Sequence, residues 1–348
     1  MLEGAAEDKA RSQLLTGGAT APRGARRYFC TYLDSRYLSR GLVLYRSLIK
    51  HVGDFELWIL CFDQLAYDAL VALQLSKVRL VSLDEFERGD DELLAVKSTR
   101  SDVEYFFTCT PSWPLYVLAR NEHIDVLGYL DADLYFYSSP ESVYEELEAG
   151  SLLITAHDFP DDLKVQERFG RFNVGLMLFR HDEYALSALS WWRERCLEWC
   201  YDRVEDGRFA DQKYLDQWPT LFPKTRVMRK PAGAVAPWNW MNYEISWDRD
   251  QIIVNGERLV TYHFQSVSLH HGRVYNAGLS SYRRMPSNLR RRIYLPYIRE
   301  LAQMETLIGR ILPRGQLRAP GRARRTTLFS RQLVDALRGG DLGVRIRR

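Results

Sequence analysis

The sequence lacks the features that mark several protein classes. It has no apolar run approaching the ~18 residues that span a bilayer, so we expect no membrane-spanning helix. Its 5 cysteines, an odd and scattered set, fit a reducing compartment better than a disulfide framework. Residues 1–26 carry no apolar core of the kind a secretory signal needs. These absences predict a cytoplasmic protein.

Lysine is absent from the last 66 residues, although the whole chain is almost balanced in charge. The net charge is +3 over 348 residues, but residues 283–348 contain 17 arginines and 4 acids. That segment therefore carries +13, and the preceding residues carry −10. We expect an acidic body and a basic end with separate roles. A hydrophobic content of 46% is ample for a buried core and excludes a disordered chain.

Strand and helix patterns alternate through the body of the chain, after a flexible arm at residues 1–26. This alternation predicts an α/β fold with a mostly parallel sheet, whose ligands bind at the carboxyl ends of the strands. Asn255-Gly256 predicts a hairpin that joins strands at 252–254 and 259–264. The other predicted strands are 28–33, 55–61, 78–81, 126–130, 151–156 and 172–179; the predicted helices are 36–51, 64–75, 111–121 and 186–201.

Two carboxylates follow the predicted strand at 126–130. Asp131 and Asp133, separated by Ala132, point the same way in an extended segment. Hard oxygen ligands at the mouth of a sheet can hold Mg²⁺ or Mn²⁺ together with the phosphates of a nucleotide. A second Asp-x-Asp, at residues 248–250, lies in a polar turn where a solvated loop explains it.

Further polar side chains admit both a structural and a functional interpretation. His263, on the second strand of the predicted hairpin, is either a hydrogen-bonded core residue or a metal ligand beside the two aspartates. The Asn173-x-Gly175 segment marks either close approach of a ligand or a bulge. Asp211, before Gln212, could simply cap a short helix. Trp238 suits a sugar ring or the edge of a core.

Taken in order, Asp-Ala-Asp after a strand, Phe-Asn-x-Gly, Asp-Gln and a late strand histidine resemble the GT-A fold glycosyltransferases that use nucleotide sugars. The resemblance is greatest to the retaining family 8 group and covers residues 28–272. It implies a mixed, mostly parallel Rossmann-like sheet flanked by helices, as a catalytic domain at residues 27–275. The C-terminal helices would occupy residues 276–312 and an Arg-rich tail residues 313–348.

The resemblance also implies roles for single residues. Asp131, Asp133 and His263 would bind Mn²⁺ or Mg²⁺, with Asp131 and Ala132 beside the donor diphosphate. Asn173, Asp211 and Gln212 would touch the transferred sugar or the acceptor near the anomeric carbon. The nucleoside of the donor, UDP-hexose by likeness, would contact the first strand and the turn after it at Thr31, Tyr32, Asp34 and Tyr37.

Two cations expected from the family are missing. In the family, a lysine follows the metal-binding histidine, and no lysine occurs from Phe264 to Val267. The arginine usually found on the helix before the Asp pair has no match in residues 111–120. We expect Lys97 or Arg100 to replace one of them. Asp211 could also serve as the base of an inverting enzyme, so retention and inversion both stay open.

The implied reaction transfers a hexose to a saccharide or lipid-linked acceptor in cell-surface polysaccharide synthesis. Two alternatives come from other classes: a haloacid-dehalogenase-like phosphohydrolase, which also carries Asp-x-Asp at a strand end, and a non-catalytic sugar-nucleotide-binding protein. Tyr135 stands where the phosphohydrolases expect Thr or Val.

The basic end carries amphipathic helix patterns at residues 289–312, where Pro296 predicts two shorter helices, and at 328–337. Such helices either pack on the enzyme or lie on an anionic membrane surface at the inner face of the membrane. Nucleic-acid binding is not expected, because no reader motif is present.

If the tail provides a membrane contact, deleting residues 313–348 will abolish co-sedimentation with vesicles that contain anionic lipid, because the arginines supply the attraction. Neutral vesicles serve as the control, since they lack that attraction. Unchanged co-sedimentation of the shortened chain would contradict the membrane role.

Overall fold

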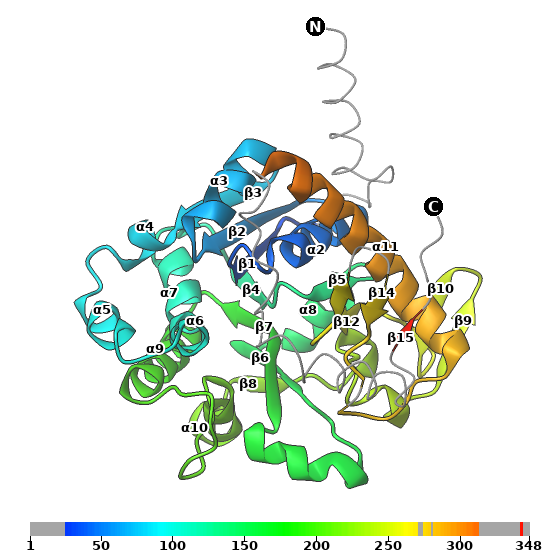
Figure 1. Cartoon of the computed structure of the whole chain (residues 1–348). Helices are drawn as coiled ribbons and strands as arrows, with labels where there is room; N and C mark the ends of the chain where they lie inside the picture. Colours follow the sequence, from blue (N-terminus) through cyan, green and yellow to red (C-terminus); the bar gives the residue numbers. More distant parts are fainter. Residues whose placement is uncertain (1–24, 271–273, 280, 313–341, 344–348) are drawn as a thin grey trace, which may run out of the picture.

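A seven-stranded mixed sheet forms the centre of the computed structural model, which describes residues 25–270, 274–279, 281–312 and 342–343 (Figure 1). The strand order is β3-β2-β1-β4-β7-β6-β8, with β7 antiparallel to both of its neighbours and every other pair parallel. The predicted mostly parallel α/β sheet is confirmed. The strands are β1 (Arg27–Leu33), β2 (Phe55–Cys61), β3 (Val78–Ser82), β4 (Val126–Leu130), β6 (Leu152–Ala156), β7 (Phe172–Arg180) and β8 (Thr225–Val227).

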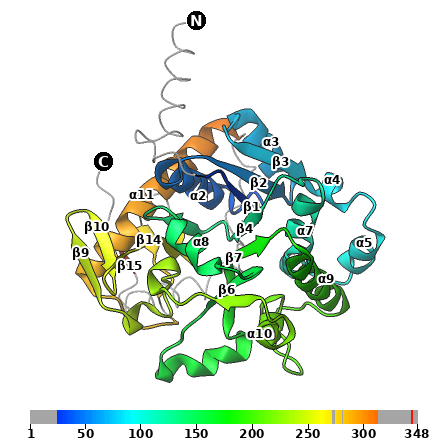
Figure 2. The ribbon, with the colours of Figure 1, turned by 180° about the vertical axis from the view of Figure 1, so that it is seen from behind.

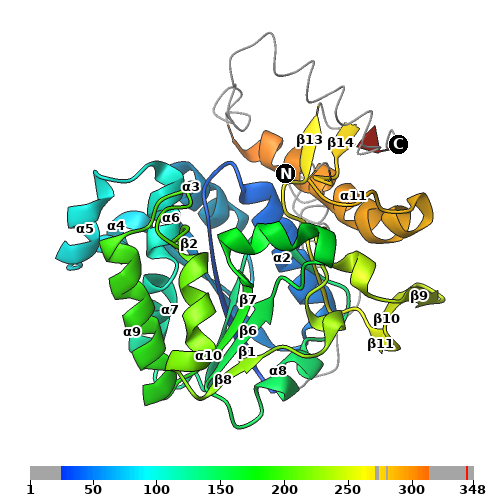
Figure 3. The ribbon, with the colours of Figure 1, turned by 90° about the horizontal axis from the view of Figure 1, so that it is seen from below.

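Helices cover both faces of this sheet, and alternate residues of each strand pack under different helices. In β1, Phe29 joins one buried cluster and Cys30 joins the other. Figure 3 shows α7 and α9 on one side of the sheet and α2 and α11 on the other. The helices on the first side include α6 (Asp102–Cys109), α7 (Ser112–Ala119) and α9 (Glu183–Glu198); those on the second are α2 (Leu38–His51), α3 (Gln64–Leu73) and α11 (Ser287–Ile311).

Polar side chains fix where several helices begin. The Asp63 carboxylate caps α3, Asp182 caps α9, and Ser101 forms a capping box with Glu104 at the start of α6. The remaining helical elements are short. They are α4 (Leu83–Glu87), α5 (Asp91–Lys97), α8 (Glu141–Leu147), α10 (Trp218–Leu221), η1 (Asp161–Phe169), η2 (Gln212–Gln217), η3 (Pro231–Gly233) and η4 (Trp240–Asn242).

The predicted hairpin around Asn255-Gly256 exists, but its second strand was placed wrongly. Strand β10 (Gln251–Val254) turns through Asn255 and Gly256 into β11 (Glu257–Arg258) and also pairs with β9 (Ile245–Asp248). The buried segment β12 (Thr261–His263) instead pairs with β5 (Leu134–Phe136). Exposed β11 completes the hairpin, while burial draws β12 against the strand that follows the Asp pair.

A single helix, α11, replaces the two shorter helices that Pro296 predicted. The proline removes one backbone donor, yet Ile293, Tyr297 and Leu301 are all fully buried along one side of the helix. That burial outweighs the lost hydrogen bond. Viewed from the front and from behind, α11 crosses α2 (Figures 1 and 2). Of the two interpretations of this amphipathic segment, packing on the body is the one observed.

The last described strands form a small separate sheet, in which β14 (Val274–Asn276) pairs with β13 (Ser268–His270) and with β15 (Leu342–Gly343). The helix predicted at residues 328–337 lies outside the described residues. Within the ranges that the structure describes, no helix is both long and apolar enough to cross a membrane.

Candidate active site

Three candidate metal ligands meet at the carboxyl end of β4. Asp131 and Asp133 lie between β4 and β5, and the pairing of β12 with β5 sets His263 opposite Leu134, the residue after Asp133. The Nε2 atom of His263 lies 3.0 Å from Oδ1 of Asp133 and 3.6 Å from Oδ2 of Asp131. Residues far apart in sequence thus form one cluster, as predicted.

Backbone and side-chain hydrogen bonds hold this cluster in place. The Asp131 amide donates to the Gly175 carbonyl, and the Phe264 amide donates to the Asp133 carbonyl. The Tyr129 hydroxyl donates to Oδ1 of Asp131 at 2.9 Å. Tyr129 was not predicted as a site residue, although the period-two alternation of a strand places it on the same face as Asp131.

The charges of the three side chains interact strongly because the side chains are close together and Asp133 and His263 are buried. Burial lowers the pKa of His263, but the charge and hydrogen bond of Asp133, followed by the charge of Asp131, outweigh it and leave the pKa above its usual value. Burial raises the pKa of Asp131 to about 6, against the opposing charge of His263. The protonated imidazole thus balances carboxylate charge that would otherwise be costly to bury.

This donor set fits a divalent cation. One ligand atom from each of Asp131, Asp133 and His263 can be chosen so that all lie within 4.8 Å of one another. Carboxylate oxygens suit Mg²⁺ and Mn²⁺, and an imidazole nitrogen can complete such a set. Asp248 is the exposed last residue of β9 and Asp250 lies in the exposed turn that follows it, so both carboxylates are solvated as expected.

The predicted sugar-contacting residues lie beside the cluster. Asn173 is two residues before Gly175, and its Nδ2 atom lies 3.5 Å from Oε1 of Gln212. Gln212 is anchored by donation to the Phe169 carbonyl. Asp211 is buried, and burial raises its pKa to about 7, a rise opposed by a hydrogen bond from Thr110 and reinforced by the charge of Asp131. The structure thus brings Asn173, Asp211 and Gln212 close to the candidate metal ligands.

Aromatic rings form one wall of this region. The Trp238 ring meets the rings of His263 and His157 edge-on, with centroids 5.4 and 5.2 Å away. His157 stacks on Phe159, and its buried Nδ1 makes no hydrogen bond to any described residue. Burial lowers the pKa of His157 to about 3, so the ring is neutral. Trp238 is thus a buried wall residue, and His157, which follows the predicted strand at 151–156, was missed.

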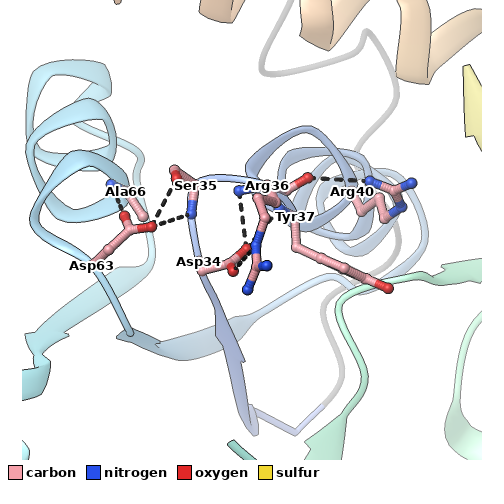
Figure 4. A network of polar contacts seen from close by, with 7 residues as sticks. All are labelled: Asp34, Ser35, Arg36, Tyr37, Arg40, Asp63 and Ala66. Atoms are coloured by element: carbon pink, nitrogen blue, oxygen red, sulfur yellow. Dashed lines mark hydrogen bonds and ion pairs between the residues drawn. The ribbon is translucent and has the colours of Figure 1, made fainter. Parts of the chain in front are cut away.

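The residues expected around the nucleoside differ in their exposure to solvent. Thr31 is fully buried and Tyr32 bonds Thr110, whereas Tyr37 is exposed at the start of α2. Asp34 receives the amides of Arg36 and Tyr37 and pairs with the Arg36 guanidinium (Figure 4). Figure 4 also shows Ser35 bound to Asp63, which joins the ends of β1 and β2.

A hollow of about 480 Å³ opens beside these strand ends. Lys97 and Arg100 both line it, together with Asp34, Arg36 and the stacked rings of Phe62 and Phe106. Lys97 is already paired with the buried carboxylate of Glu87, and Arg100 lies over the Tyr201 ring and donates to the Leu197 carbonyl. Lys97 and Arg100, the two expected phosphate-binding side chains, therefore line the hollow and also make contacts within the protein.

Gly175 offers a test of the close packing around the ligands. A Cβ added there would lie 2.5 Å from Oδ1 of Asn173 and 2.6 Å from Nδ1 of His263. Gly175→Ala should therefore displace His263, weakening Mn²⁺ binding about 10-fold or more and lowering the free energy of unfolding by about 1–3 kcal/mol.

Calorimetric titration with Mn²⁺ and denaturant unfolding measure these two effects. Gly309→Ala is the matched control, because apart from the neighbouring residues and backbone of α11 no described atom lies within 4 Å of the added carbon, and this variant should keep full Mn²⁺ affinity. Unchanged Mn²⁺ affinity in folded Gly175→Ala protein would refute the assigned packing.

No protein-family model matches the chain. Among solved structures, that of the galactosyltransferase LgtC with donor and acceptor sugar analogues is similar, with a TM-score of 0.50 and 13% identity. The match covers 79% of this chain and 95% of LgtC. The mixed seven-stranded sheet flanked by helices is the GT-A fold, as predicted.

Two curated proteins of Bacillus subtilis (strain 168) are closer in sequence. YfnF is 31% identical over 293 residues, which are 80% of this chain and 91% of YfnF. YfnD is 31% identical over 278 residues, which are 79% of this chain and 88% of YfnD. Such identity over most of each chain shows common descent. The chain belongs to the family that includes YfnF and YfnD.

Proposed function

We propose that the protein is a metal-dependent glycosyltransferase that uses a nucleotide sugar as donor. The observation that carries the proposal is the cluster of Asp131, Asp133 and His263 at the carboxyl end of β4 in a GT-A fold. Ligand sites of open α/β sheets lie at this edge. The structural likeness to LgtC, whose structure holds donor and acceptor sugar analogues, supports the same use of the site.

At a finer level, we propose a family 8-like hexosyltransferase with a UDP-hexose donor. The acceptor would be a saccharide or a lipid-linked saccharide of cell-surface polysaccharide synthesis. The nucleoside would enter the hollow lined by Asp34, Lys97 and Arg100, next to exposed Tyr37. The diphosphate would then lie between this hollow and the carboxylate pair.

The side chains divide the chemical work. Asp131, Asp133 and His263 would hold a Mn²⁺ or Mg²⁺ ion, which supplies positive charge to the diphosphate leaving group. Asn173 and Gln212 present amides to the sugar, and positioned amide dipoles stabilise the positive charge that develops at its anomeric carbon. Buried Asp211 can hold or accept a proton near neutral pH, because burial has raised its pKa to about 7.

The phosphohydrolase and the non-catalytic binding protein, the two alternatives to a transferase, differ in how well they agree with the fold. The GT-A fold leaves the phosphohydrolase hypothesis without structural support. A non-catalytic protein that binds sugar nucleotides would use the same metal cluster and the same hollow. Only turnover distinguishes that protein from a transferase.

Mn²⁺-dependent release of free UDP or GDP from a panel of sugar nucleotides tests for turnover. Asp133→Ala should lower release about 100-fold or more, because it removes a carboxylate that holds charge against the leaving group. Asp250→Ala, in the exposed turn, is the matched control and should keep full activity. Donor binding without release would favour the non-catalytic alternative, and no binding of any donor would end the proposal.

Mn²⁺ affinity should depend on pH, because metal and protons compete for the same atoms. The pKa of His263 is raised and that of Asp131 is about 6, so both hold protons as the pH falls below neutral. Affinity should be nearly constant above the pKa of His263 and fall about 10-fold per pH unit, or more, below about pH 6. Titrations at several pH values measure it, and His263→Gln should flatten the dependence. Affinity independent of pH would remove these residues from the metal site.

A further inference from the structure

Arg40 lies in the first turn of α2 and spans two backbone segments of the site. Its Nη1 atom donates to the Arg36 carbonyl at 3.2 Å, and Nη2 donates to the Val267 carbonyl at 2.7 Å. The guanidinium also lies 4.6 Å from the centroid of the Tyr37 ring. Val267 is four residues after His263, so Arg40 joins the start of α2 to the segment that leaves the metal cluster.

Within the described part of the chain, the charge of Arg40 has no direct carboxylate partner, unlike that of its neighbours. Arg36 pairs with Asp34, Arg46 with Glu300 and Lys97 with Glu87. Among the described residues, no carboxylate lies within 4.0 Å of Arg40. Figure 4 shows Arg36 turned toward Asp34, whereas Arg40 leaves the first turn of α2 in another direction. A half-buried arginine of this kind has guanidinium donors left for an anion.

This charge acts on the metal cluster. Burial raises the pKa of Asp133, but the charge and hydrogen bond of His263 and then the charge of Arg40 leave it below the usual value. The same positive charge opposes the raised pKa of Tyr37, of Tyr297 and of Glu305. Arg40 therefore lies near both the exposed Tyr37 ring and the carboxylate that would hold the metal.

A second polar group near Arg40 is the hydroxyl of Tyr297 in α11. Tyr297 is fully buried, its ring stacks on Phe264 at 3.8 Å between centroids, and its hydroxyl makes no hydrogen bond to any described residue. Burial raises the pKa of this hydroxyl, and Arg40, Asp133 and Glu305 are among the charged groups that act on it. A buried hydroxyl without a partner is costly, so a ligand that reaches it gains the hydrogen bond.

We propose that Arg40, with the Tyr297 hydroxyl as a second donor, binds a phosphate group of the nucleoside diphosphate. The inference rests on the proposed function, which supplies the diphosphate. A dication between two ionised carboxylates and a neutral imidazole carries no net charge, so the diphosphate needs another cation. Arg40 meets that need, because its planar fork matches phosphate oxygens and its charge is not neutralised by a pair.

Binding of UDP and of GDP, each with Mn²⁺, tests this role by calorimetry on the full chain. Arg40→Gln should weaken binding of the nucleoside diphosphate about 10- to 100-fold, as expected for the loss of a charge-assisted contact. Arg40→Lys should recover part of that loss, and Tyr297→Phe should weaken binding about 3- to 10-fold. Arg46→Gln, on the same helix but paired with Glu300, should bind as the wild type does.

Titration with Mn²⁺ alone separates phosphate binding from a purely structural role. If Arg40 binds phosphate, Arg40→Gln keeps its Mn²⁺ affinity, because removing a positive charge near Asp133 does not hinder a cation. Equal loss of Mn²⁺ and nucleotide binding in Arg40→Gln and Arg40→Lys would show that Arg40 only anchors the Val267 segment, and would overturn the inference. Unchanged nucleotide affinity in Arg40→Gln would also overturn it. If the wild type binds neither UDP nor GDP, the proposed function fails first.

Discussion

The pairing of β12 with β5 is the interaction on which the candidate site depends. It sets His263 opposite Leu134, and the Phe264 amide then donates to the Asp133 carbonyl. His263 follows Asp133 by more than a hundred residues in the sequence, and this short antiparallel pair brings the two side chains together in space. The parallel sheet positions the Asp pair, but a segment from beyond the sheet completes the ligand set.

Electrostatic repulsion explains why the Asp131 and Asp133 carboxylates must be held in place by several hydrogen bonds. Asp131 and Asp133 are close in sequence and shielded from water, so their mutual repulsion and loss of hydration favour protonation. His263 offsets this cost while it carries a proton, at 3.0 Å from Asp133. A divalent ion would replace that proton with a larger charge at the same place. The protein without metal thus keeps its carboxylates ready for a cation, and Arg40 adds positive charge beside them.

Local patterns predicted the elements, because strand and helix periodicities are local properties. The segment at 55–61 matches β2, and the apolar run that ends at Leu130 matches β4. Two errors, at the hairpin and at Pro296, came from long-range burial that overrides local signals, and no helix was predicted where α4, α5 and α6 lie. Nothing in the sequence near Val267 indicates Arg40, because that contact joins residues 227 positions apart. Asp131 and Asp133 were candidates because they follow a recognisable apolar strand, whereas His263 was a candidate only because of that Asp pair and the resemblance in motif order.

Helix α11, which belongs to the basic end of the sequence, packs on the α/β body. Its apolar residues Ile293, Tyr297 and Leu301 are buried in the same cluster as α2. Glu300, also buried, accepts a hydrogen bond from Tyr135 of β5 and pairs with Arg46 of α2. The apolar face of α11 is therefore already used, and a membrane could meet only the exposed arginines of this helix. Because Tyr135 lies on the strand that pairs with β12, α11 is joined through Glu300 to the strand beside the candidate metal cluster.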